Sequence, residues 1–130
     1  MKLPKVLKFN VKYLMQIQSA EIHRIDYTSY SRNRFTFDIR IWPDRTKSDQ
    51  FVDFRTAFYD SGSAEAYAIE FIETATDGIY GEIGLSEMEG AVFVGKLMTN
   101  TKTDEFGNKN VYVNLVACKH VGFCEIDDCM

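Results

Sequence analysis

The sequence predicts a mainly β fold with five strands and one helix between the third and the fourth strand. Apolar and polar residues alternate through most of the chain, which is typical of strands with one buried face. Only residues 60–78 change to the helical spacing of apolar residues. Clusters of turn-forming residues separate the alternating segments. With 130 residues, of which 45 % are hydrophobic, the chain is long and apolar enough for one globular domain.

The first half of the chain predicts three strands. Residues 5–25 alternate loosely, which indicates one long, bent strand or two short ones. Residues 26–34 are rich in turn formers, and residues 34–42 then alternate most regularly. A proline opens the turn over residues 43–50, and residues 51–59 make up the third predicted strand.

In the second and third predicted strands, one face is suited to a core and the other mixes charges with aromatic rings. The core-facing positions are Phe35, Phe37, Ile39, Ile41, Val52, Phe54, Thr56 and Phe58. The other face carries Thr36, Asp38, Arg40, Trp42, Phe51, Asp53, Arg55, Ala57 and Tyr59. In both strands this second face carries an arginine and a terminal aromatic ring.

The second half of the chain predicts one helix and two strands. Residues 60–78 combine helical spacing with serines for the N-cap and a glycine at the end. Residues 79–90 contain three glycines and indicate a loop or a broken turn. Residues 91–100 and 111–123 alternate as strands, and residues 101–110 are the hairpin loop between them.

This order of elements is that of the OB fold, a small antiparallel β-barrel. We therefore expect a five-stranded OB-fold barrel with one helix between strands 3 and 4. The barrel would cover residues 1–123, and residues 124–130 would be a short acidic tail.

Residues 90–123 resemble the C-terminal half of bacterial and phage single-stranded-DNA-binding proteins. That family has a strand in which two valines are followed by a glycine, a leucine and a threonine. This strand leads into an Asp-x-x-Gly hairpin, and the next strand ends in Val-x-Phe. The matching positions here are Val92, Val94, Gly95, Leu97, Thr99, Asp104, Gly107, Val121 and Phe123. The order of strands, tryptophan-bearing turn and helix upstream is similar too, so the resemblance covers roughly residues 20–123.

The resemblance implies a protein that binds single-stranded DNA without sequence preference and coats exposed strands during replication or recombination. It also implies a homodimer or homotetramer, joined through the N-terminal strand or exposed strand edges, with phage or host recombination and replication proteins as further partners. Two segments depart from the family pattern, since residues 79–90 are longer and richer in glycine and acid, and residues 124–130 lack a linker and a Pro-Phe end. The compact size suggests a phage-type member, acting in the cytoplasm, which is that of the host if a phage encodes it.

Four aromatic residues are candidates for stacking on bases. The resemblance ranks Trp42 first, because the family has a stacking tryptophan at this place; the alternative is that Trp42 anchors the core. Phe51 and Tyr59 share the face of Asp53 and Arg55, unless the helix covers that face. Phe106 stands in the predicted hairpin loop, where a large apolar ring gains nothing from water, so we expect it to fold over DNA or to contact a second subunit.

Seven cations recur on the same face and in the same hairpin as these rings. The candidates for phosphate contacts are Arg40, Arg45, Lys47, Arg55, Lys96, Lys102 and Lys109. Each is by itself an ordinary solvated charge, and Arg32 and Arg34 in the preceding turn are weaker candidates. Contacts of this kind release counterions, so the affinity for DNA should fall as salt rises.

The charge distribution supports an alternative function. The net charge is −4, and residues 61–90 hold 7 Asp or Glu and no Lys or Arg, whereas residues 1–60 hold 11 Lys or Arg and 7 Asp or Glu. An OB-like protein-binding module, such as an inhibitor or an assembly factor, would act through the acidic segment 61–90. RNA binding on the same surface stays open, because no residue marks contacts to a 2′-hydroxyl.

Several other classes are not expected from the sequence. No motif with the spacing of a catalytic site or of a phosphate-binding loop occurs, so we expect no enzyme. An odd number of cysteines without a secretion signal favours reduced thiols, and Cys118, His120, Cys124 and Cys129 match no familiar ligand spacing, so we expect neither a metal nor another cofactor. No apolar run reaches the roughly 18–20 residues of a membrane span.

Overall fold

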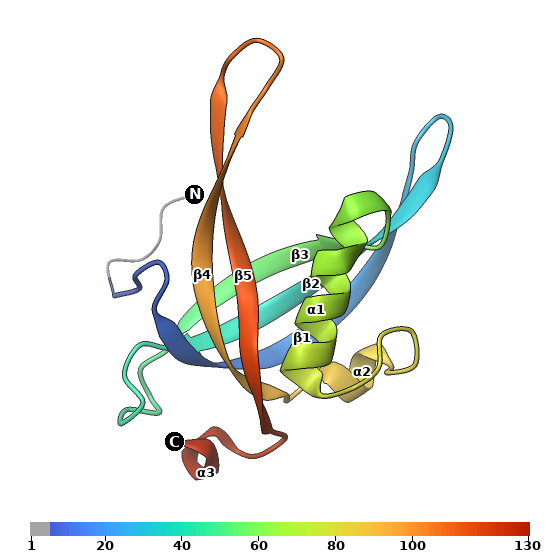
Figure 1. Ribbon diagram of the computed structural model, residues 1–130. Helices are drawn as coiled ribbons and strands as arrows, with labels where there is room; N and C mark the ends of the chain where they lie inside the picture. Colours follow the sequence, from blue (N-terminus) through green and yellow to red (C-terminus); the bar gives the residue numbers. More distant parts are fainter. Residues whose placement is uncertain (1–5) are drawn as a thin grey trace.

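The structure is a computed structural model that describes residues 6–130 (Figure 1). Residues 1–5, which include the start of the predicted domain and of the predicted first strand, lie outside the described residues. The strands are β1 Lys12–Asp26, β2 Ser31–Trp42, β3 Val52–Tyr59, β4 Val92–Thr103 and β5 Lys109–Gly122. The helices are α1 Glu65–Thr76, preceded by the 3-10 turn Gly62–Ala64, and two single turns, α2 Leu85–Met88 and α3 Ile126–Cys129. Nowhere in this range does a helix have the length and apolar character of a membrane span.

All five strands belong to one antiparallel sheet in the order β3-β2-β1-β4-β5. Strand β1 lies at the centre, and its first residues pair with β4 on one side and with β2 on the other. The register with β2 shifts between Ile17 and Ser19, and a bulge of this kind bends a strand. Residues 12–26 are therefore one long, bent strand, which is the first of the two predicted alternatives.

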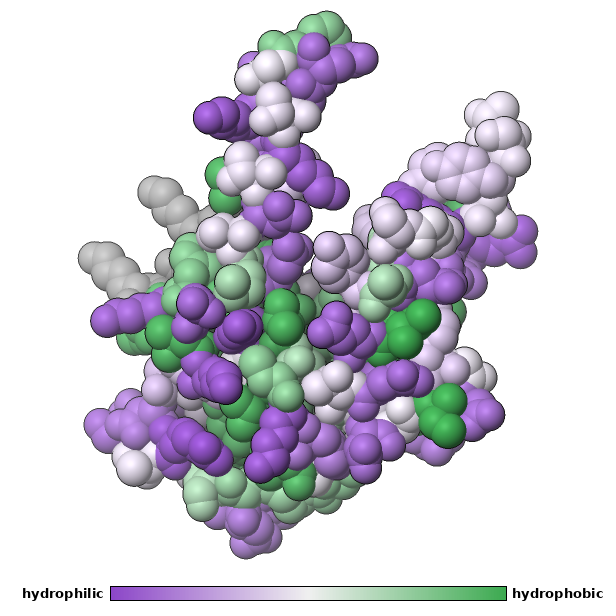
Figure 2. All heavy atoms as spheres, viewed as in Figure 1, coloured by the Kyte–Doolittle hydropathy of each residue, from purple (hydrophilic) through white to green (hydrophobic). Residues whose placement is uncertain are grey.

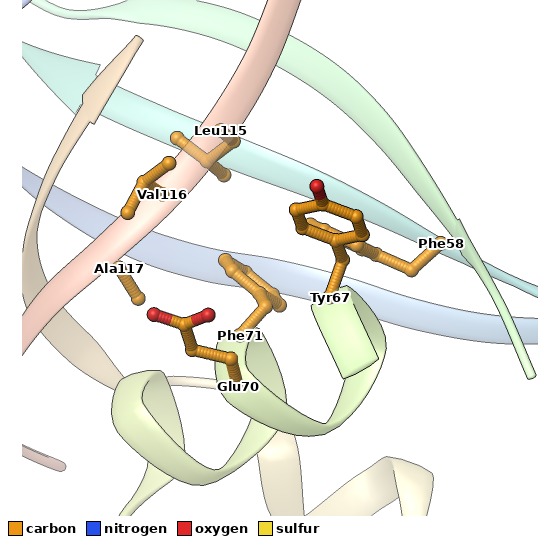
Figure 3. A pocket seen from close by; sticks show the side chains of 7 residues that line it. All are labelled: Phe58, Tyr67, Glu70, Phe71, Leu115, Val116 and Ala117. Atoms are coloured by element: carbon orange, nitrogen blue, oxygen red, sulfur yellow. The ribbon is translucent and has the colours of Figure 1, made fainter. Parts of the chain in front are cut away.

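The mainly β class of the prediction is confirmed, but the sheet is not closed into a barrel. Within residues 6–130 the edge strands β3 and β5 do not pair with each other. Helix α1 lies between them, and Figure 3 shows Phe58 of β3, Tyr67 and Phe71 of α1, and Leu115 of β5 around the gap. The cavity left there has a volume of about 20 Å³, which is room for about one water molecule. Side chains of the helix thus occupy the place where the two strand edges would have to meet.

The core is a cluster of aromatic rings between α1 and the sheet. Phe71 of α1 is 2 % exposed, and its ring stacks on Phe58 with the ring centres 4.6 Å apart. The rings of Phe37 and Phe93 lie 5.0 and 5.6 Å from that of Phe71. These tilted and stacked arrangements are the favoured ones for aromatic pairs, so Phe71 connects the helix to both halves of the sheet.

Two hairpins extend beyond this core as arms (Figure 1). Strands β1 and β2 stay paired up to Asp26 and Ser31, and β4 and β5 up to Thr103 and Lys109. Both loops are therefore shorter than the predicted loops over residues 26–34 and 101–110. Ladder hydrogen bonds join main-chain groups, so the pairing continues through polar, exposed residues that show no apolar alternation.

Gly95 of β4 has no room for a side chain, and we predict that Gly95→Ala destabilises the fold. A Cβ atom there would stand 2.8 Å from Sδ of Met15 and 3.1 Å from the main-chain oxygen of Val116. Overpacking of this kind costs about 1–3 kcal/mol, which urea denaturation would measure. The matched control is Gly122→Ala, where the nearest atom lies 3.6 Å away and little change is expected. Equal effects of the two substitutions would contradict the tight packing at Gly95.

Candidate nucleic-acid interface

Helix α1 packs on one face of the sheet, and the opposite face of β1, β2 and β3 points away from the helix. The buried side chains of α1 pack on Phe37 and Phe58, which point to the core. The other side of these strands is here called the outer face. The alternation along each strand and the cross-strand register show which residues lie on it. Its residues are Glu21, His23, Arg34, Thr36, Asp38, Arg40, Trp42, Asp53, Arg55, Ala57 and Tyr59. The face that the sequence singled out is therefore not the one that packs against the helix.

The prediction that Trp42 is the main stacking residue requires correction, because the ring is buried. Trp42 is 2 % exposed, and its Nε1 donates a hydrogen bond to the main-chain oxygen of Ser48 at 2.8 Å. It pairs across the strands with Leu14, which is also fully buried, and the ring of Phe51 stands edge-on 6.2 Å away. Trp42 thus belongs to the buried core, as the alternative interpretation had it, and its indole also holds the loop between β2 and β3.

Phe51 and Tyr59 lie at opposite ends of the third strand, and each ring carries an arginine on one side. The guanidinium carbon of Arg40 lies 3.7 Å from the ring centre of Phe51, and that of Arg32 lies 3.9 Å from the ring centre of Tyr59. Phe51 is exposed and Tyr59 half-buried. Guanidinium groups attract the faces of aromatic rings, so these contacts hold cations and rings together in pairs.

Two of the predicted phosphate contacts are already engaged with carboxylates. Arg55 donates to both oxygens of Asp38 at 2.9 and 3.2 Å, and Nε of Arg40 lies 3.4 Å from Asp53. The hydrogen bonds from Arg55 and from Ser19 hold the pKa of Asp38 below its ordinary value, and Asp38 in turn raises the pKa of Arg55. Since both pairs are largely exposed to solvent, they are weak and a stronger anion can replace the carboxylate.

The other predicted cations lie in two separate places. Arg45 and Lys47 are exposed in the loop between β2 and β3. Lys96 is half-buried in β4, where it pairs with Lys12 of β1, and Lys102 and Lys109 are exposed on the arm formed by β4 and β5. The predicted cations thus divide between the loop at one end of the outer face and the strands around β4.

Phe106 stands at the tip of the β4–β5 arm, in an ordered loop. Its ring is 80 % exposed, while Oδ1 of Asp104 accepts hydrogen bonds from the main-chain nitrogens of Phe106 and Asn108 at 2.9 and 2.8 Å. Gly107 has a φ of 81°, a conformation that favours glycine. The loop therefore holds the main chain on both sides of a ring that is not part of the core.

The arm also carries apolar side chains that the sequence analysis did not single out. Val111 and Tyr112 of β5 are exposed, and Nζ of Lys102 lies 5.8 Å from the ring centre of Tyr112. The sequence signal was present, because residues 111–113 are all apolar, and in a strand successive side chains point to opposite faces, so at least one of them faces outward. Figure 2 shows this arm and the β1–β2 arm standing away from the body, with open space between them.

The β1–β2 arm holds a second group of rings. Tyr27 and Tyr30 stack with ring centres 4.6 Å apart, and Arg32 donates a hydrogen bond to the hydroxyl of Tyr27 at 3.1 Å. Both tyrosines are exposed. Each of the two arms thus ends in aromatic side chains beside a cation.

The C-terminal cysteines differ from the expectation of reduced thiols. Cys124 and Cys129 form a disulfide across the single turn of α3, while Cys118 is a free, half-buried thiol. Nδ1 of His120 donates to the main-chain oxygen of Ala75 at 2.8 Å and thereby joins β5 to α1. Throughout residues 6–130, no three His, Cys, Asp or Glu side chains are grouped so that they could hold a metal ion.

Comparisons with protein-family models, with curated proteins and with solved structures find no match to this chain.

Proposed function

We propose that this protein binds single-stranded DNA without sequence preference, on an open variant of the OB fold. The observation that carries the proposal is the placement of exposed rings on the two arms and at Phe51, together with cations on the outer face, on surfaces that the core does not use. The strand order, with the main helix α1 between the third and the fourth strand, supports the OB assignment. Rings would stack on bases and lysines would track the phosphates.

The proposed mode of action is stoichiometric coating of exposed strands in replication or recombination, by a phage-type member of the family. A short surface holds few nucleotides, so several copies would act together as a homodimer or homotetramer. The edge strands β3 and β5 leave main-chain groups for such pairing. Light scattering on the purified protein would give the number of copies.

The test of the proposed function is fluorescence anisotropy of a labelled oligo-dT at several salt concentrations. About three phosphate contacts would lower the affinity roughly 20-fold between about 50 and 200 mM salt. Mixed-sequence oligonucleotides should bind within a few-fold of oligo-dT, and duplex DNA should bind more weakly. Oligo-U in the same assay separates DNA from RNA binding. An oligo-dT that does not bind at the lowest salt would overturn the proposal.

A second candidate function is favoured by the exposed apolar side chains of the acidic segment 61–90. Tyr67 of α1 is 66 % exposed, and Ile79 after the helix is exposed as well. Apolar side chains among carboxylates suit a basic, apolar protein partner. If the protein does not bind oligo-dT but binds a protein partner through Tyr67, its function is that of a protein-binding module.

A further inference from the structure

A hollow with a volume of about 240 Å³ lies on the outer face, where β1, β2 and β3 run side by side. The register of the sheet assembles it, because His23 stands opposite Arg34, and Thr36 stands opposite Ala57. The residues that line the hollow are His23, Arg34, Thr36, Arg55, Thr56 and Ala57. None of the predicted stacking rings lies among them, so the hollow needs a separate explanation.

Two polar atoms of these lining residues are buried without a hydrogen-bond partner, Nε of Arg34 and Oγ1 of Thr36. Thr36 is only 9 % exposed. An unsatisfied buried hydroxyl destabilises a folded protein, and valine would fill the same branched shape without that penalty. The hydroxyl at position 36 therefore gains nothing within the chain and points to a ligand that accepts a hydrogen bond.

The charges around the hollow indicate that this ligand is an anion. Arg34 takes part in none of the ion pairs found in residues 6–130. Two carboxylates stand beside the hollow, and each is paired with one of its lining residues: Asp38 accepts from Arg55, and Glu21 lies 3.1 Å from Nε2 of His23. A guanidinium without a carboxylate, beside a hydroxyl without an acceptor, can donate to two or more oxygens of one group.

We propose that this hollow binds a phosphate group through Arg34 and Thr36, and that the phosphate is a phosphodiester of the bound single strand. The identity of the ligand rests on the proposed function, whereas the donor set does not. The register sets Tyr59 opposite Arg34, so a base next to this phosphate meets an aromatic ring. The hollow would thus fix the path of the strand on the outer face.

The first part of the test uses Arg34→Gln and Thr36→Val in the oligo-dT assay. Loss of one phosphate contact should weaken binding about tenfold for Arg34→Gln and lower the slope of log affinity against log salt by about 0.7. Thr36→Val should weaken binding several-fold while its Tm rises, because an unsatisfied hydroxyl is removed. The control is Lys119→Gln, an exposed lysine of β5 opposite Val94 that lies outside the outer face and both arms, which should leave the slope unchanged.

The second part of the test follows the Arg34 Nε–H and the Thr36 methyl group by NMR while inorganic phosphate is added to the whole chain. Oligo-dT binding of wild-type strength in both variants would overturn the phosphate site and leave the proposed function intact. Shifts with phosphate but no binding of oligo-dT would support the site, make a free phosphate compound its ligand and overturn the proposed function. Shifts with neither probe and no effect of the variants would overturn the site.

Discussion

Replacing Phe71 by alanine should lower the free energy of unfolding by about 3–5 kcal/mol, the range for a buried aromatic ring. Phe71 is 2 % exposed and touches aromatic rings from β2, β3 and β4, so its loss leaves a cavity lined by three side chains that cannot all move inward. The Tm should fall by roughly 10–25 °C for a chain of this size. Thermal unfolding followed by circular dichroism measures this change.

The matched control is Tyr67→Ala, one helical turn earlier on α1. Tyr67 is 66 % exposed, so its loss should change the free energy of unfolding by less than about 1 kcal/mol. A similar effect of both substitutions would mean that α1 does not pack on the sheet through Phe71. Trp42, the last residue of β2, is buried, so the fluorescence of its indole provides an independent probe of the same unfolding transition.

Much of the fold could be predicted from the sequence because the two periodicities are local. Alternation over residues 34–42 and 51–59 gave strands that match β2 and β3, and helical spacing over residues 60–78 gave α1. The closed barrel could not be predicted in the same way. Whether β3 and β5 pair depends on how deeply α1 inserts between them, and the size of Tyr67 and Phe71 does not reveal that depth.

The candidate site depended on features that no single strand contains. Alternation placed Trp42 on the correct face of β2, but its burial depends on the loop that folds back and offers the oxygen of Ser48. The pairing of Arg55 with Asp38 depends on the register between β2 and β3. The register also brings His23 and Arg34 together, so the hollow between them had no signal in the linear sequence.

The exposed rings of the β4–β5 arm give the largest expected effect on DNA binding. The double variant Phe106→Ala, Tyr112→Ala should weaken oligo-dT binding about 30-fold or more, because each stacked base contributes about 1–3 kcal/mol. Its Tm should stay unchanged, since neither ring contacts the core and both are exposed. Anisotropy and thermal unfolding, measured on the same preparation, separate the two quantities.

The control for this variant is the double substitution Tyr67→Ala, Ile79→Ala, which removes a similar exposed apolar area from the acidic segment and should leave oligo-dT affinity unchanged. If the arm variant kept full affinity but changed the mass measured by light scattering, Phe106 would be a contact between subunits. The loop geometry favours the DNA contact: Asp104 already holds the main chain on both sides of the ring, so a base that stacks on Phe106 meets an ordered partner. Asp104→Ala, which keeps the ring but frees the loop, should therefore weaken binding by less than removal of the ring itself.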